Sequence, residues 1–331
     1  MSNSQSVPPA PTLRGALWLY LAALIGTALI VIGLQGAIRS LSLLRLIAAF
    51  LAVGVPLFIA AFALRLPIAA SFGRSPRLLH LAAAILIGVL AWLPASWLTF
   101  AANYALDAAV GFLPPPPAVT EGVLPFAAVI QLGIVVPTLQ GALFWAYLQR
   151  NAKGLGANGA ALLVAALYGL FALVSTEFGY AGIVGALLIG LLAAFTTRYT
   201  ESAWGGIAVG WGYSLMRPLL ENTPLEAELF TALGTDLFGG AWLLAFGGGA
   251  FAALFILQML RAFYSAPPQP DSGRAPSMGR AWQVPLVITL LICLLIGYSE
   301  FALRAQNAVP VAPAPADEGS TVVPIRPTAA P

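Results

Sequence analysis

Long apolar runs, broken by short polar segments, are the main feature of this chain. Charged residues make up 8% of its 331 residues, and they stand between the apolar runs instead of within them. No charge separates the members of these pairs: Arg14 and Arg39, Arg45 and Arg65, Glu121 and Arg150, Lys153 and Glu177, Glu177 and Arg198, Asp236 and Arg261, Arg280 and Glu300. A bilayer core about 30 Å thick is crossed by a helix of roughly 20 apolar residues, and a charge at its centre costs about 3 kcal/mol or more. The pattern predicts an all-α fold, a polytopic bundle of transmembrane helices.

The apolar runs divide into nine predicted spans, of which the seventh is short. They cover residues 15–35, 44–64, 80–101, 123–148, 158–176, 180–198, 202–219, 240–263 and 282–303. The runs are continuous and lack the alternation of lipid-facing β-strands, so a barrel is not expected. The first run is too long for the core of a signal peptide, which favours a retained helix.

Composition narrows the class of partner. The chain is 60% hydrophobic with a mean hydropathy of +0.90, which makes the lipid bilayer its main partner. The net charge of +3 is too small and too dispersed to indicate binding of nucleic acid. Cys293 is the one cysteine, so no internal disulfide is possible, and we expect it to be a buried apolar side chain. We expect a multi-pass protein of a bacterial cell membrane.

Basic residues sort unequally between the two sides of the predicted spans. Ten of the 15 lie on the side of the N-terminus and five on the other. The first set is Arg14, Arg65, Arg74, Arg77, Arg150, Lys153, Arg198, Arg261, Arg274 and Arg280, and the second is Arg39, Arg45, Arg217, Arg304 and Arg326. Cytoplasmic loops carry the excess of basic residues, so the N-terminus is predicted inside and the C-terminus outside.

Seven segments follow from this division. They are a cytoplasmic tail (1–14), N-terminal transmembrane helices (15–122), a core (123–220), an interfacial helix with the eighth span (221–263), a flexible linker (264–281), the last span (282–303) and a disordered tail (304–331). The interfacial helix is predicted near 224–237 from the capping box formed by Thr223 and Glu226 and from leucines that recur every four residues.

Three segments of the core carry a recurring set of small, polar and aromatic residues. In the fourth span, Pro137 is followed by the pair Gln140 and Gly141 and by the aromatic stretch from Phe144 to Leu148. In the fifth, Phe171 precedes Ser175 by four positions. In the seventh, Ser202 opens the helix, and Gly210 and Ser214 follow four positions apart.

The order and register of these segments, over about residues 123–216, resemble the motifs of the CPBP family of intramembrane metalloproteases, which process CAAX proteins and bacteriocins. The family motifs are a proline followed by a Glu-Glu pair and Phe-Arg-Gly-x-Leu, then Phe-x-x-x-His, then His-x-x-x-Asn. Gln140 and Gly141 stand at the glutamate positions, Ser175 and Gly210 at the histidine positions, and Ser214 at the asparagine position. Trp145 replaces the arginine and Ala146 the glycine.

The resemblance implies a CPBP-like four-helix core, and in the family a glutamate base with histidine and asparagine ligands for a metal. Here no carboxylate or imidazole stands at those positions, and the one histidine, His80, lies outside the motifs. We therefore expect a catalytically inactive member, a pseudoenzyme without catalytic residues, cofactor or metal.

Three functions stay open at this point. The chain is a scaffold that binds a membrane protein or peptide partner, or an active CAAX-type endopeptidase with nonstandard residues, or an unrelated structural or transport bundle. Transport is disfavoured because no span has a central charge and no inverted repeat is visible. Gln131 and Gln140 are predicted to form hydrogen bonds between helices, and Gly206, Gly210 and Gly212 to allow close helix packing.

Overall fold

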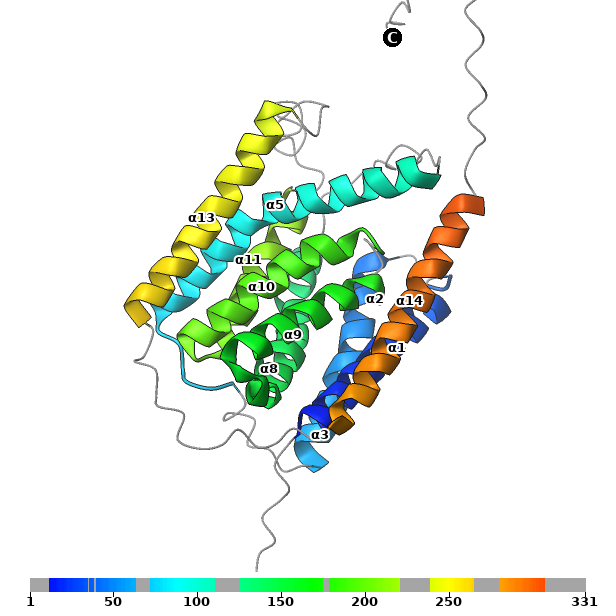
Figure 1. The fold of residues 1–331 in the computed structure, drawn as a ribbon, viewed down its shortest axis with the longest axis horizontal. Helices are drawn as coiled ribbons and strands as arrows, with labels where there is room; N and C mark the ends of the chain where they lie inside the picture. The colour runs from blue at the N-terminus through cyan, green and yellow to red at the C-terminus, as the bar shows by residue number, and fades with distance from the viewer. Residues whose placement is uncertain are drawn as a thin grey trace, which may run out of the picture.

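Helices account for nearly all of the described chain, because in lipid every backbone N–H and C=O group must find its partner within the protein. The computed structural model describes residues 12–34, 36–38, 40–63, 72–110, 126–174, 179–220, 239–264 and 280–306. Within these ranges the only β-pairing is an isolated bridge between Gly73 and Ser202. Figure 1 shows the helices running between two ends of one bundle.

The elements follow the predicted spans closely. The first three spans are α1 (Leu13–Leu34), then α2 (Leu41–Ala48) with η1 (Ala49–Gly54) and α3 (Val55–Ala63), then α5 (Leu78–Val110). The fourth span is continuous from residue 126 to 151 and comprises α6 (Phe126–Ile130), η2 (Gln131–Val135), α7 (Val136–Gly141), η3 (Ala142–Leu148) and α8 (Gln149–Asn151). The fifth comprises η4 (Lys153–Leu155), α9 (Gly156–Phe171) and η5 (Ala172–Val174). The remaining elements are α10 (Gly182–Thr200), α11 (Ala203–Leu220), α13 (Gly240–Tyr264), η6 (Arg280–Trp282) and α14 (Gln283–Gln306).

Eight of the described helical segments are long and apolar enough to cross a membrane, and the chain is a multi-pass integral membrane protein. The seventh predicted span, 202–219, corresponds to the 18-residue α11, which is not among these eight segments. The interfacial helix predicted near 224–237, Ser175, most of the linker and the tail after Gln306 lie outside the described residues.

Proline explains two departures from α-helical geometry. Pro56 and Pro137 carry no N–H, so the carbonyl four residues earlier loses its usual donor. Just before each proline the helix widens into a π-helical turn, η1 before Pro56 and η2 before Pro137. The residue preceding each proline then donates to the carbonyl five positions back, Val55 to Phe50 and Val136 to Gln131.

Helix α11 lies directly against α5. A Cβ atom at Gly212 would lie 2.1 Å from the carbonyl oxygen of Ile85, and one at Gly88 would lie 2.1 Å from that of Val209. Both distances are far shorter than a van der Waals contact, so the two backbones meet where only glycine fits. The close packing predicted for Gly212 is confirmed, and its partner is α5.

Most of the described basic residues gather at one end of the bundle. In Figure 1 the start of α1, the end of α3, the start of α5, the α8–α9 junction and the end of α13 gather at one end. Backbone bonds pin the segment before α5 to the α10–α11 turn there: Ala203 N donates to Phe72 O (2.9 Å), and Arg74 N donates to Glu201 O (3.2 Å). That end, the basic end, carries Arg14, Arg74, Arg77, Arg150, Lys153, Arg198 and Arg261. Its location on the cytoplasmic side stays a prediction.

Candidate functional site

The segments that carry the first and third motif patterns lie against each other. The fourth span and α11 run antiparallel, and small residues of one helix receive large residues of the other. We call this contact the central seam; it comprises Gly133, Pro137, Gly141 and Trp145 of the fourth span and Gly206, Ile207, Gly210 and Leu215 of α11. Neighbouring helices in lipid approach closely where such small residues occur.

The seam is tight along its length. A Cβ atom at Gly133 would lie 2.2 Å from Leu215 Cδ2, and one at Gly141 would lie 2.4 Å from Ile207 Cγ1. A Cβ atom at Gly206 would lie 2.7 Å from Trp145 Cγ, which itself is buried. With the contact between Pro137 and Gly210, the seam has four contacts between a glycine and a larger side chain. Along the seam the glycine belongs in turn to the fourth span and to α11.

The motif positions Gly141 and Gly210 both lie in this seam. Gly141 is buried against Ile207, and Gly210 is buried with Pro137 Cβ 3.3 Å from where its own Cβ would stand. Gln140 and Ser214 are half-buried in the same two helices. Two of the five degenerate positions thus lie in the seam, two more lie on the same pair of helices, and the fifth, Ser175, lies outside the described residues.

A hydrogen bond crosses the seam beside these positions. Trp211 Nε1 donates to Thr138 Oγ1 (2.9 Å), and Thr138 Oγ1 donates to the carbonyl of Ile134 within its own helix (2.6 Å). The hydroxyl group of Thr138 thus joins the two helices and also satisfies a carbonyl in the widened turn. Apart from it the seam contacts are apolar or backbone contacts.

An aromatic cluster connects the second motif pattern to the first. Phe144 is fully buried, and its ring lies 5.6 Å from that of Phe171 in an edge-to-face arrangement. It also packs edge-to-face on Tyr20 (5.8 Å) and Tyr168 (5.1 Å). The hydroxyl group of Tyr20 donates to the carbonyl of Leu167 (2.8 Å), so α1 is joined to α9 at the same level. Edge-to-face pairs contribute about 1 kcal/mol each beyond their buried area.

The glutamine that forms a hydrogen bond between helices is not one of the two predicted from the sequence. Gln149 Nε2 donates to the carbonyl of Ala194 in α10 (2.8 Å), whereas Gln131 and Gln140 make no such bond to a described residue. Gln149 was missed because it stands next to Arg150 at the end of a predicted span, where a polar residue is ordinary. Its burial follows from the packing of α10 over the end of the fourth span.

Metal-ligating side chains do not cluster in the described ranges: no group of three or more His, Cys, Asp or Glu residues occurs there. His80 is buried at the start of α5. Cys293 is buried in α14, as predicted. The side chains described at the seam are amide, hydroxyl, indole and apolar groups, which pack and donate hydrogen bonds but are poor metal ligands.

The structure thus places Gly141 and Gly210 in a packed contact between two helices. Comparison of the chain with known protein families, with curated proteins and with solved structures finds no match.

Proposed function

We propose that this membrane protein has a CPBP-like core that is catalytically inactive and serves as a scaffold for a partner within the membrane. The observation that supports the proposal is the central seam. At the positions where the family pattern has a glutamate and a histidine, Gly141 faces Ile207 and Gly210 faces Pro137. Because the two helices are in direct contact at these positions, side chains fill the space that a metal ion and its bound water would need.

The chemistry of the side chains supports the same conclusion. An intramembrane metalloprotease needs ligands that compete with water for the metal and a base that accepts a proton. Gln140 has an amide in place of a carboxylate, and Ser214 has a hydroxyl group. In place of catalysis, a packed pair of helices can hold the outer helices of the bundle rigidly. The outer helices can then present a surface to another membrane segment.

The first experiment tests catalysis and metal together. The full chain, purified in detergent, is assayed for zinc by elemental analysis and for cleavage of a prenylated peptide. We expect no stoichiometric zinc and no cleavage. Stoichiometric zinc that is lost in the variants Gln140→Ala or Ser214→Ala would overturn the proposal, as would cleavage that depends on either residue.

The second experiment restores the family residues one at a time. Gly141→Glu places a carboxyl group where Ile207 already lies, so we expect the variant to unfold more easily and to bind no zinc. Gly248→Glu is a matched control, since a Cβ atom at Gly248 has no neighbouring atom within 4 Å. A Gly141→Glu variant as stable as the parent would contradict the packed seam on which the proposal rests.

A third experiment addresses the scaffold role directly. Photo-crosslinking residues are placed at the exposed positions Leu244 and Phe251 of α13 and at the half-buried position 140. A scaffold is expected to give adducts at an outer face that persist in the Ser214→Ala variant. Adducts confined to position 140 would indicate a substrate path and would count against a scaffold.

A further inference from the structure

The basic end of the bundle contains a short segment that is held unusually firmly for a loop. Besides the two backbone bonds to the α10–α11 turn, the ring of Phe72 stacks on Trp204 at 5.1 Å. Gly73 adopts a positive φ of 75°, and a Cβ atom there would lie 2.5 Å from Glu201 O. Only glycine allows this approach, so the segment from Phe72 to Arg74 is fixed in position just before α5 begins.

Two exposed arginines lie at the end of this fixed segment and just after it. Arg74 and Arg77 are both exposed, and α5 begins at Leu78, directly after the second of them. Within the described part of the chain neither guanidinium group is engaged by a carboxylate. Glu201 is the acidic side chain described at this end, against basic groups from five helices. Among the described side chains, the positive charge there is therefore largely uncompensated.

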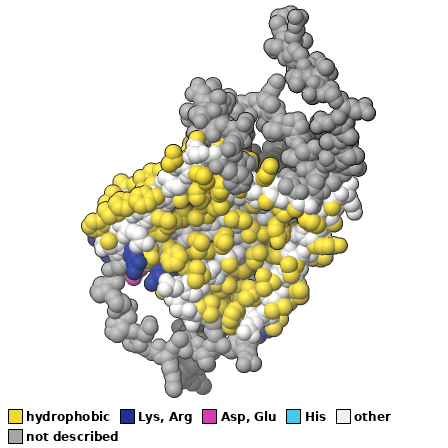
Figure 2. All heavy atoms as spheres, turned by 45° about the horizontal axis from the view of Figure 1, so that its top comes forward, with side chains coloured by type: hydrophobic (Ala, Val, Ile, Leu, Met, Phe, Trp, Pro, Cys, Tyr) yellow, Lys and Arg dark blue, Asp and Glu magenta, His cyan; other side chains and the backbone are white. Residues whose placement is uncertain are grey.

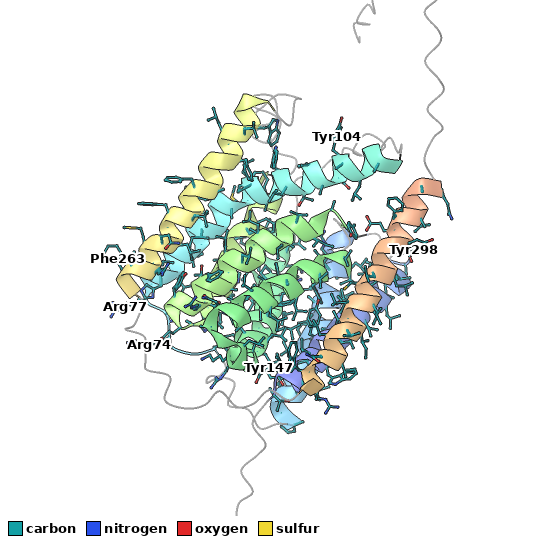
Figure 3. All side chains as sticks on the ribbon, in the orientation of Figure 1. Arg74, Arg77, Tyr104, Tyr147, Phe263 and Tyr298 are labelled. Atoms are coloured by element: carbon teal, nitrogen blue, oxygen red, sulfur yellow. The ribbon has the colours of Figure 1, made fainter. Side chains whose placement is uncertain are left out.

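Exposed apolar side chains adjoin the two arginines. Leu78 and Leu79 at the start of α5 are 85% and 68% exposed, and Phe263 at the end of α13 is 69% exposed. The two helices run antiparallel, with Gly249 of α13 packed on Leu90 O, so the start of α5 and the end of α13 lie at the same level. Figure 3 shows Arg74, Arg77 and Phe263 at this corner of the bundle. Figure 2 shows Lys and Arg side chains gathered at the edge of a surface that is otherwise mainly apolar.

We propose that Arg74 and Arg77, with the exposed apolar side chains of α5 and α13 beside them, bind an anionic phospholipid. The guanidinium groups meet the headgroup phosphate, for which the planar arginine fork is well suited. Leu78, Leu79 and Phe263 contact the upper acyl chains. A soluble phosphate would use the arginines and leave the apolar side chains without a role, which is why the proposal is for a lipid.

The site differs from general attraction of basic residues to a membrane surface in one respect. Each cationic side chain near an anionic membrane contributes about a fivefold gain in binding wherever it stands. Here the segment is fixed before the lipid arrives, so little freedom is lost on binding. The proposal therefore requires that Arg74 and Arg77 matter more than other basic residues at the same end. It is independent of whether the core is catalytic.

The test uses the full chain reconstituted in bilayers of phosphatidylcholine with phosphatidylglycerol. The lipids that remain bound after extraction into mild detergent are counted by native mass spectrometry. We expect the parent protein to retain phosphatidylglycerol over phosphatidylcholine. The double variant Arg74→Gln/Arg77→Gln is expected to lose more of this preference than the roughly fivefold per arginine that general surface attraction accounts for.

Three further arms make the result decisive. Arg74→Lys/Arg77→Lys keeps both charges and is expected to keep most of the preference, which separates loss of charge from loss of fold. Arg14→Gln removes an exposed charge from α1 at the same end and is expected to lower the preference by no more than the general fivefold. Excess inorganic phosphate is expected to leave the lipid in place.

The opposite outcomes overturn the proposal. An unchanged preference in the double glutamine variant, or a loss in Arg14→Gln as large as the loss per arginine in the double variant, would show general surface attraction in place of a site. Displacement of the lipid by inorganic phosphate would show a site for a soluble anion.

Discussion

The helices α11 and α14 show opposite relations between apolarity and burial. The 18-residue α11 contains four glycines, two tryptophans and Arg217, yet its residues from Gly205 to Gly210 are all buried. The span formed by α14 has a mean hydropathy of 2.3, yet only 17% of it is buried. In lipid an apolar side chain gains little by leaving the bilayer, so small residues that let backbones approach determine which helix lies inside.

The two helices are also held by different interactions. Along α11 the contacts are continuous, from Trp145 at one end of the central seam to Gly133 at the other, with α5 on another face. Near its C-terminal end α14 is held by a few defined contacts. Glu300 Oε2 accepts from Tyr180 N at the start of α10 (2.7 Å), and a Cβ atom at Gly297 would touch the Tyr180 ring. We therefore expect substitutions all along α11 to destabilise the protein, and substitutions in α14 to do so only at these contacts.

The largest expected effect comes from filling the contact between α11 and α5. Gly212→Leu places its Cβ against the backbone of Ile85, which cannot move aside as a side chain can. We expect a loss of about 3 kcal/mol or more in the free energy of unfolding. The rate at which a thiol-reactive dye labels Cys293, the one cysteine and a buried one, reports unfolding. Gly247→Leu on α13, where no atom lies within 4 Å, is the control, and equal effects would remove the distinction between the helices.

A smaller effect is expected from the hydrogen bond across the central seam. Trp211→Phe removes the donor to Thr138, and Thr138→Val removes the acceptor. Hydrogen bonds between membrane helices contribute about 1 kcal/mol. A double-mutant cycle on unfolding in denaturing detergent is expected to give a coupling energy of that size. Purely additive effects would mean that the seam is held by packing alone.

The attachment of α14 through Glu300 is expected to contribute less. Glu300→Gln keeps an oxygen that can accept from Tyr180 N but removes the negative charge at the start of α10, which costs about 0.5 kcal/mol. Labelling of Cys293 should become faster while the rest of the bundle unfolds as before. Ser299→Ala is the neighbouring control, since the Ser299 hydroxyl bonds only within its own helix, to Leu295 O (2.8 Å). If that variant speeds labelling equally, the Glu300 contact does not hold the helix.

The smallest effect is expected on the outer face of α14. Leu294 is 66% exposed, and in Leu294→Ala lipid replaces the lost methyl groups, so we expect a change within about 0.5 kcal/mol. Leu143→Ala in the fourth span removes a fully buried side chain and is expected to cost about 2 kcal/mol or more. Thermal unfolding in the same detergent compares the two. A large loss in Leu294→Ala would mean that this face packs against protein.

Much of the fold was predictable because charge is so costly in a bilayer that it marks the ends of every span. The sorting of basic residues by end follows from the same cost. The candidate site was predictable only as a set of positions: Gly141, Gly210 and Trp145 were identified from their register. Whether these positions enclose a cavity or fill a contact depends on which helices meet. The role of Gln149 was not visible either, because a polar residue beside Arg150 reads as the end of a span.

By itself the sequence determined that this is a helical membrane protein, where its spans lie and that its motif-like positions lack catalytic side chains. The tertiary structure decided that α11, a span rich in glycine, lies against both the fourth span and α5. It also decided that Gly73 fixes Arg74 and Arg77 beside the apolar ends of α5 and α13. The physical reason is that apolarity distinguishes protein from water but not protein from lipid, so contacts between helices depend on shapes that meet only in the folded chain.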